Sequence, residues 1–269
     1  MEHSTSKSGR RPLIERLNVF TAFALGAISA FVVWRLALQF LPADAETAPL
    51  FTREDKITLL SMIAWFVGFM TGIGALIGPF RWVMGKDLTH EENMYYAGKD
   101  MGLKRYFRYT TDHKVVGIQY LAITMFIFFV GGVLAMLIRT NLGTPEGGWI
   151  HPQAYNSIVG THGIIMIVGT IIMVTGPFGN YIMPIMIGAR DMAFPRLNAL
   201  SFWLIVAAAI PLLWGQFIGG ISTGWTAYNP LAGQAPLGMN GYIMFICIFA
   251  LSTMVAGANI TISQVTCDD

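Results

Sequence analysis

The chain alternates between long apolar runs and short polar or charged stretches. Six runs of about 20 or more residues are nearly free of charge, and they cover residues 17–41, 57–80, 115–138, 157–188, 197–220 and 239–265. A helix of about 20 apolar residues is long enough to cross the hydrocarbon core of a bilayer. The pattern therefore predicts an all-α fold, a polytopic membrane bundle of about six transmembrane helices.

Composition supports an integral membrane protein. Of the 269 residues, 54% are hydrophobic and 12% are charged, whereas a soluble domain is about a quarter charged. The net charge of +2 gives no indication of a nucleic-acid partner. Cys247 and Cys267 would lie about 30 Å apart on one continuous helix, so we expect free thiols. No C-x-x-C-H motif is present, which excludes covalent c-type haem.

Lysine and arginine are distributed unevenly around the six runs. If every run crosses the membrane, thirteen of these residues fall on one side and three on the other. The larger group is Lys7, Arg10, Arg11, Arg16, Arg81, Lys86, Lys99, Lys104, Arg105, Arg108, Lys114, Arg190 and Arg196, and the smaller is Arg53, Lys56 and Arg139. Because basic loops stay in the cytoplasm, we expect both termini and the loop bearing Asp191 to face it. We expect the side chain of Arg35, inside the first run, to extend to the interface.

The fourth run contains a single imidazole, His162, about 8 Å past the start of the run at Ser157. Spacings of four and three place a set of residues on one helical face with it: Met166, Gly169, Met173, Gly176 and Asn180. Gly160 and Gly163 flank the histidine with little bulk, which would let a flat ligand such as haem lie close to the backbone. The alternative is a helix-end histidine that a neighbour or headgroup water satisfies. An ionisable group inside a membrane span favours a functional role.

The second run carries small residues at four-residue spacing: Ala64, Gly68 and Gly72, then Gly74 and Gly78. Small residues in this pattern allow helix backbones to approach closely, so we expect this run to pack on another helix. Thr52 and Asp55 have the spacing of a helix start.

The sequence THGIIMIVGTIIMVTGPFGNYIMPIMIGARDMAFPRLNALSFWL, followed by STGWTAYNPLAG, resembles subunit I of the haem-copper terminal oxidases, best the A-type cytochrome c and quinol oxidases. The resemblance runs from about Thr111 to Ile260 and corresponds to helices one to four of the twelve in that family. It implies a part in reducing oxygen to water with electrons from cytochrome c or quinol, coupled to proton pumping. The implied partners are the remaining oxidase helices or subunits and membrane lipid, and the implied location is a bacterial plasma membrane.

The resemblance also implies roles for individual residues. His162 would be an axial ligand of a low-spin haem, of type A, and Arg139 would bond a substituent of that haem. Asp191 would be the cytoplasmic mouth of the D proton pathway. The water chain of that pathway would be held by Asn180, Asn198, Ser201 and Tyr120.

Ordinary roles are open to the same residues. Asp191 could pair with Arg190 or Arg196, the two asparagines could satisfy helix ends, and Arg139 could anchor the interface. His113, in TDHK, falls at the membrane edge and is expected to be an interfacial residue. Three positions depart from the family pattern. Asn141 stands where a Glu helps to bind a structural cation, Arg190 stands for a Pro, and Ala199 stands for an Asn.

Together these observations predict five regions: a cytoplasmic tail at 1–16, a two-helix membrane extension at 17–80, an interfacial linker at 81–114, a partial oxidase core at 115–265 and a short end at 266–269.

The sequence contains five histidines: His3, His90, His113, His151 and His162. The family places its second low-spin ligand, its high-spin haem ligand and its three copper ligands on later helices. We therefore expect the N-terminal portion of subunit I, from a truncated, frameshifted or split gene, with copper and high-spin haem only in the complete subunit. Expressed alone, this chain should consume no oxygen. The alternatives are a nitric oxide reductase-like subunit and a non-enzymatic membrane scaffold or transporter.

Overall fold

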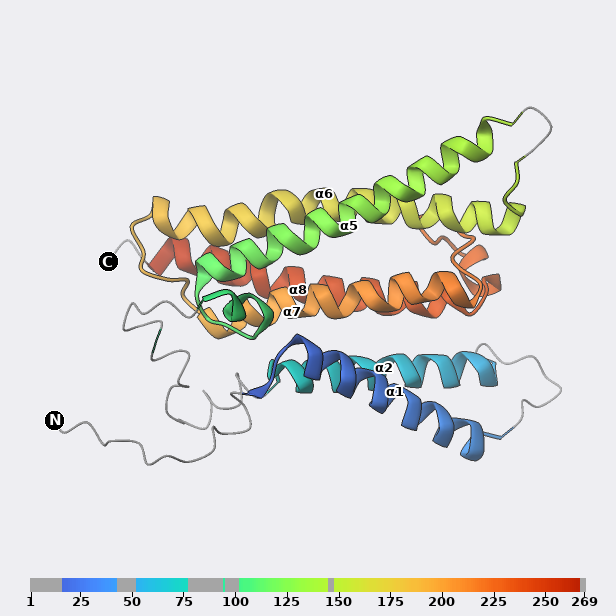
Figure 1. Cartoon of the computed structure of the whole chain (residues 1–269), viewed down its shortest axis with the longest axis horizontal. Coiled ribbons are helices and arrows are strands. Elements are labelled where there is room, and N and C mark those ends of the chain that lie inside the picture. Colours follow the sequence, from blue (N-terminus) through green and yellow to red (C-terminus); the bar gives the residue numbers. More distant parts are fainter. Residues whose placement is uncertain (1–15, 43–51, 77–93, 95–101, 145–147, 267–269) are drawn as a thin grey trace.

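The computed structural model describes residues 16–42, 52–76, 94, 102–144 and 148–266. Long helices dominate this part of the chain (Figure 1). They are α1 (Val19–Phe40), α2 (Arg53–Ile73), α5 (His113–Leu142), α6 (Pro152–Met186), α7 (Pro195–Gly215) and α8 (Gly238–Thr266), with short 3-10 helices η2 (Gly102–Phe107), η3 (Gln216–Ile218) and η4 (Leu231–Gln234). Six helices are long and apolar enough to cross a membrane. The predicted polytopic helical bundle is therefore confirmed.

The helices form two groups (Figure 1). In the core, α5 packs along α6 and α7 packs along α8, and in the other group α1 and α2 form a hairpin beside α7 and α8. At one end of the core, α5 and α7 begin and α6 and α8 end. We call this the Asp191 end, after a residue of the α6–α7 loop. The opposite end is called the Trp225 end, after a residue between η3 and η4. Helix α7 lies innermost, and its buried residues join all the neighbouring helices in one apolar core.

The ends of α2 follow from local sequence. The N–H of Asp55 donates to the Thr52 hydroxyl and the N–H of Thr52 donates to the Asp55 carboxylate, so the predicted helix start is confirmed as a capping box. Gly74 caps the other end in the left-handed conformation, with φ of 85°. The helix therefore ends before the predicted limit at Phe80, which lies outside the described residues.

Glycines bring α1 and α2 close together, as the small-residue spacing predicts. A Cβ added to Gly68 would lie 2.1 Å from Ser29 Oγ, and one added to Gly72 would lie 2.6 Å from the Cα of Ala22. Only a residue without a side chain allows this approach. The expected role of Gly74 in the same stripe is wrong, because it serves as the cap of α2. Gly78 lies outside the described residues.

Hydroxyl groups add hydrogen bonds between the same two helices. Ser29 Oγ donates to the carbonyl of Ala64 at 2.7 Å, and Thr21 Oγ1 donates to the carbonyl of Gly72 at 2.8 Å. Each bond crosses the interface from α1 to α2, so polar atoms on this hairpin serve to hold it together.

The hairpin is also fixed to the core. The ring of Phe69 on α2 lies 6.2 Å from that of Trp203 on α7, and Asn240 Nδ2 on α8 donates to Asp55 Oδ1 at 2.9 Å. The predicted tail at 1–16 and the predicted linker at 81–114 fall largely outside the described residues. Of the linker, the structure gives Met94, η2 and the start of α5.

Candidate haem ligand and proton entrance

Helix α6 directs His162 toward α5. Its Nδ1 lies 2.9 Å from the carbonyl oxygen of Gly131. Because a carbonyl can only accept, Nδ1 carries the hydrogen and Nε2 keeps its lone pair. Metal-binding histidines are commonly held in this way, with one ring nitrogen donating to a backbone carbonyl and the other left for the metal. The side chain is partly exposed, so Nε2 is not enclosed by the core.

The position of His162 along the helix differs from the estimate made from the apolar run. Helix α6 begins at Pro152, so His162 lies about 15 Å from the helix start. Helix α6 has 35 residues and is longer than the roughly 30 Å hydrocarbon core, so the distance from its start does not give a depth in the membrane. His162 lies inside the helix and not at its end, and a neighbour satisfies one of its two ring nitrogens, as the alternative expected.

The glycines beside His162 have a different role from the expected one. An added Cβ on Gly160 would lie 3.4 Å from Ile221, and one on Gly163 would lie 3.2 Å from Cβ of Trp225. Protein therefore fills the space that was expected for a flat ligand, and that expectation is wrong. The two glycines instead let the segment after η3 pack against α6.

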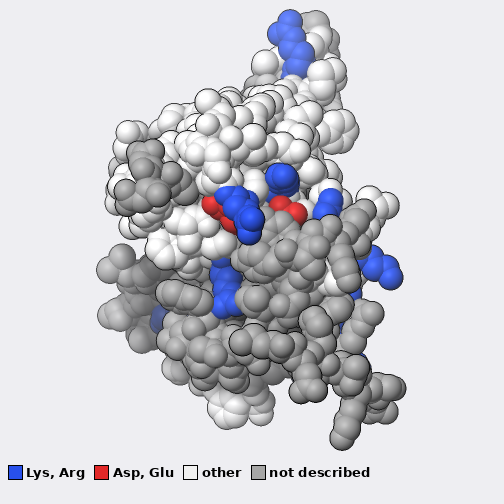
Figure 2. Space-filling model, turned by 90° about the vertical axis from the view of Figure 1, so that its left-hand side faces the viewer, with Lys and Arg blue, Asp and Glu red and all other residues white. Residues whose placement is uncertain are grey.

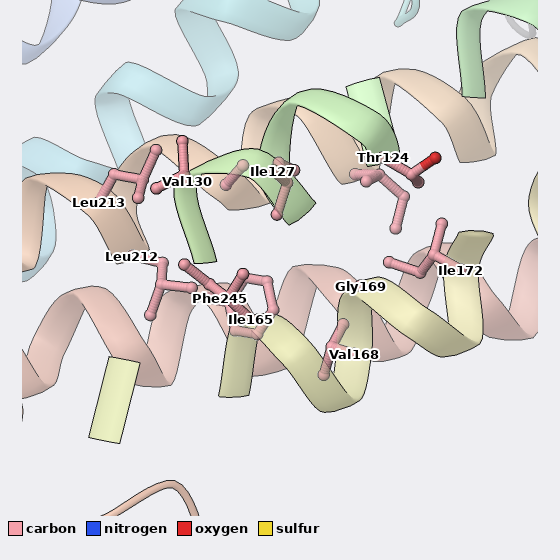
Figure 3. Close-up of a pocket in the computed structure, with 12 residues that line it drawn as sticks. Thr124, Ile127, Val130, Ile165, Val168, Gly169, Ile172, Leu212, Leu213 and Phe245 are labelled. Carbon is pink, nitrogen blue, oxygen red and sulfur yellow. The ribbon is translucent and has the colours of Figure 1, made fainter. Parts of the chain in front are cut away.

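A small cavity lies farther along the same helix, at Gly169, where an added Cβ would meet nothing within 4 Å. It has a volume of about 30 Å³ and lies between α5, α6, α7 and α8 (Figure 3). Its lining is apolar apart from Thr124, whose hydroxyl donates to the carbonyl of Tyr120 at 2.7 Å. A porphyrin does not fit there, and His162 does not line this cavity.

The structure does not place Arg139 beside His162. Arg139 is exposed on the last turn of α5, about 12 Å along the helix from Gly131. Its neighbour Asn141 is buried, and Asn141 Oδ1 accepts from the N–H of Ile150 at 2.9 Å. In this chain the asparagine that replaces the family glutamate therefore anchors the α5–α6 loop.

Asp191 is held at its end of the core by two contacts. Its Oδ1 accepts from the N–H of Met192 at 2.7 Å and lies 3.4 Å from Nδ1 of His113. His113 is the first residue of α5 and is only 1% exposed, and Asp112, which caps the helix, is also buried. The sequence places Asp191 and His113 at the same membrane edge, which is the one signal that could have suggested this contact.

The other expected pathway residues are all buried. The hydroxyls of Tyr120 and Ser201 lie 2.9 Å apart, and Ser201 Oγ donates to the carbonyl of Asn198 at 2.7 Å. Because the Ser201 hydrogen is used in that bond, Tyr120 is the donor between the two hydroxyls. Three of the predicted residues, from α5 and α7, are thus connected. Asn180 lies on α6, where its Nδ2 donates to the carbonyl of Gly176 at 2.7 Å.

Several polar atoms of this group are buried with no hydrogen-bond partner among the described residues. They are Asp191 Oδ2, Asn180 Oδ1 and Asn198 Nδ2. Buried polar atoms are rarely left unpaired, and ordered water is their usual partner when protein supplies none. The arrangement is therefore suited to holding water between the Asp191 end and the interior.

Charge gathers at this same end. Figure 2 looks onto it and shows acidic groups flanked by basic ones. Acidic Asp112 and Asp191 lie at the helix starts and loop there, and the basic residues of the same elements are Lys104, Arg105, Arg108, Lys114, Arg190 and Arg196. The electrostatic potential at this surface therefore changes sign over short distances, from negative near the two aspartates to positive near the lysines and arginines.

The structure defines the protein as a multi-span helical bundle. It holds one imidazole in a fixed orientation inside the bundle, and it has a carboxylate and buried amide groups toward one end. Residues 115–268 match the sequence model of the family described as cytochrome c and quinol oxidase polypeptide I. This match covers more than half of the chain, which therefore belongs to that family.

Similar proteins agree with this assignment. Cytochrome c oxidase subunit 1 of Thermostichus vulcanus is 44% identical over 161 residues, which is 59% of this chain and 29% of that protein. The subunit 1 of Synechocystis sp. is 46% identical over 127 residues, 47% of this chain and 23% of that protein. A probable quinol oxidase subunit 1 of Staphylococcus aureus is 40% identical over 161 residues, 59% of this chain and 24% of that protein. The chain thus spans less than a third of the length of these relatives.

Proposed function

We propose that this chain acts as part of subunit I of a respiratory terminal oxidase. In that assembly, electrons pass from cytochrome c or quinol to oxygen, and protons are pumped across the membrane. The chain would supply one ligand of the low-spin haem and the entrance for protons. Its match to cytochrome c and quinol oxidases supports this proposal over a nitric oxide reductase and over a membrane scaffold or transporter.

The observation that carries the proposal is the hydrogen bond between His162 Nδ1 and the Gly131 carbonyl. It fixes the tautomer and the ring orientation, and it leaves Nε2 as the atom that would bind the haem iron. A haem bound there, of type A by family resemblance, would accept and release single electrons. Arg139 would reach a substituent of the ring from the last turn of α5. The protein's own contribution is to hold the imidazole in one orientation against α5.

The proton entrance is supported by the buried polar groups at the Asp191 end. Asp191 would collect protons from the cytoplasm, and Asn180 and Asn198 would order water without trapping charge. The hydrogen-bonded hydroxyls of Tyr120 and Ser201 would extend this water chain inward. The concentration of basic residues at this end supports a cytoplasmic location for it, in a bacterial plasma membrane.

The proposal is tested with the variant His162→Ala in the complete oxidase assembly. Loss of the His162 imidazole should abolish the low-spin haem band in the reduced-minus-oxidised spectrum. The matched control is His151→Ala, which removes an exposed imidazole at the start of the same helix. A low-spin band of unchanged position and intensity in His162→Ala would refute the ligand role.

A further inference from the structure

The loop that carries Asp191 is bonded through its backbone to two side chains of α8. The N–H of Ala193 donates to Ser263 Oγ at 2.8 Å. The N–H of the next residue, Phe194, donates to Asn259 Oδ1, also at 2.8 Å. These bonds join residues that are 70 and 65 positions apart in the chain. Neither α8 residue is among the pathway residues that the sequence predicts, and we call the two together the α8 clasp.

The geometry of α8 explains why both side chains reach the same loop. Asn259 and Ser263 are four residues apart, so they lie on one face of the helix. Both are buried, with exposures of 1% and 0%. Ser263 Oγ also donates to the Asn259 carbonyl at 2.7 Å. Because a hydroxyl has one hydrogen and two lone pairs, that bond leaves Ser263 free to accept from the loop. The last turns of α8 therefore set the position of two successive loop residues.

The loop is also held on the other side of Asp191. The N–H of Ala189 donates to the carbonyl of Pro184 at 2.8 Å, which bonds the start of the loop to the end of α6. Asp191 therefore lies between two bonded segments, one on α6 and one on α8. Its carboxylate accepts from the N–H of Met192 and lies 3.4 Å from the ring of His113 on α5. The contact with α5 thus depends on where the loop is held.

We propose that Asn259 and Ser263 are positioning residues of the proton entrance. They take up no proton themselves. They hold the backbone of the loop on α8, so that the Asp191 carboxylate stays at its end of the core beside His113. A functional side chain needs such support, because its geometry is only as well defined as the groups that hold it. The role in proton uptake rests on the function proposed for Asp191, whereas the two hydrogen bonds can be tested in this chain alone.

The first test measures the clasp in the full chain purified in detergent. Hydrogen–deuterium exchange is followed by mass spectrometry of the peptides that contain residues 190–196. A backbone N–H exchanges when its hydrogen bond opens, so loss of the acceptor should raise the rate. Ser263→Ala should speed exchange of the Ala193 N–H by about three- to tenfold, as expected for one hydrogen bond. The matched control is Thr261→Ala, which removes an exposed hydroxyl that bonds to the Gly257 carbonyl within α8 and should leave exchange unchanged. Equal exchange in Ser263→Ala and the wild type would overturn the proposal.

The second test measures proton uptake and steady-state kinetics per haem in the complete assembly. Ser263→Ala should slow proton uptake and lower kcat by about three- to tenfold, because the carboxylate spends less time in its held position. KM for the electron donor and the haem spectrum should stay unchanged, which separates a positioning role from a general loss of structure. Normal proton uptake in Ser263→Ala, despite faster exchange, would overturn the positioning role.

Asp191→Asn, measured in parallel, shows which proposal has failed. If Asp191→Asn slows proton uptake and Ser263→Ala does not, only the positioning role is refuted. If proton uptake is normal in both variants, the proposed entrance is refuted as well, and the positioning role with it.

Discussion

The α1–α2 hairpin and the α5–α8 core differ in whether they leave buried polar atoms unpaired. In the hairpin, the hydroxyls of Thr21 and Ser29 bond to carbonyls across the interface, and the described part of the hairpin contains no buried, unpaired side-chain polar atom. In the core, Asp191, Asn180 and Asn198 keep such atoms. Paired polar groups stabilise a membrane fold, whereas unpaired ones are retained at a cost. The described part of the hairpin thus shows only the stabilising use of polar atoms, whereas the core also retains unpaired ones.

Substitution of Asp191, in the core, should have the largest effect, and it should act on turnover and not on stability. Asp191→Asn keeps the oxygen that accepts from Met192 but cannot take up a proton. Turnover of the complete assembly should therefore fall by about a hundredfold, and proton pumping should be lost. A hundredfold is about the lower limit of the rate effect that a positioned proton-transfer group usually has. Oxygen consumption and proton uptake in vesicles measure this, and the free energy of unfolding should remain unchanged. Normal proton uptake would exclude Asp191 as the entrance.

Crowding the hairpin should have the next largest effect, now on stability. Gly72→Leu forces side-chain atoms against the backbone of Ala22, so the free energy of unfolding should fall by about 1–3 kcal/mol. The control Gly132→Leu adds the same side chain on α5, where an added Cβ would meet nothing within 4 Å. Denaturant titration in detergent compares the two. If both variants unfold like the wild type, close packing of α1 on α2 is not a source of stability.

Removal of one hairpin hydrogen bond should have the smallest effect. Ser29→Ala deletes the bond to the Ala64 carbonyl and should lower the free energy of unfolding by about 0.6 kcal/mol, a typical value between membrane helices. The same titration measures it, and the activity of the assembly should not change. A clear loss of turnover without a loss of stability would mean that the hairpin has more than a structural role.

Local sequence was sufficient to predict the spans and some of their ends. The length of each apolar run identified six membrane helices, because the requirement to cross about 30 Å of hydrocarbon is a property of the run itself. Thr52 and Asp55 gave the start of α2, because a capping box involves residues only three positions apart. The resemblance to the oxidase family also came from a continuous stretch, and the family match confirmed it.

The sequence by itself thus determined how many helices are long enough to cross the membrane, which family the core belongs to and which helix carries His162. Only the tertiary structure decided what each polar atom meets: the carbonyl of Gly131 for His162, the carboxylate of Asp191 for His113, and protein beside Gly160 and Gly163. The reason is physical. A membrane helix is apolar on all sides, so its periodicity does not show which face it turns toward a neighbour. That choice depends on how the helices pack.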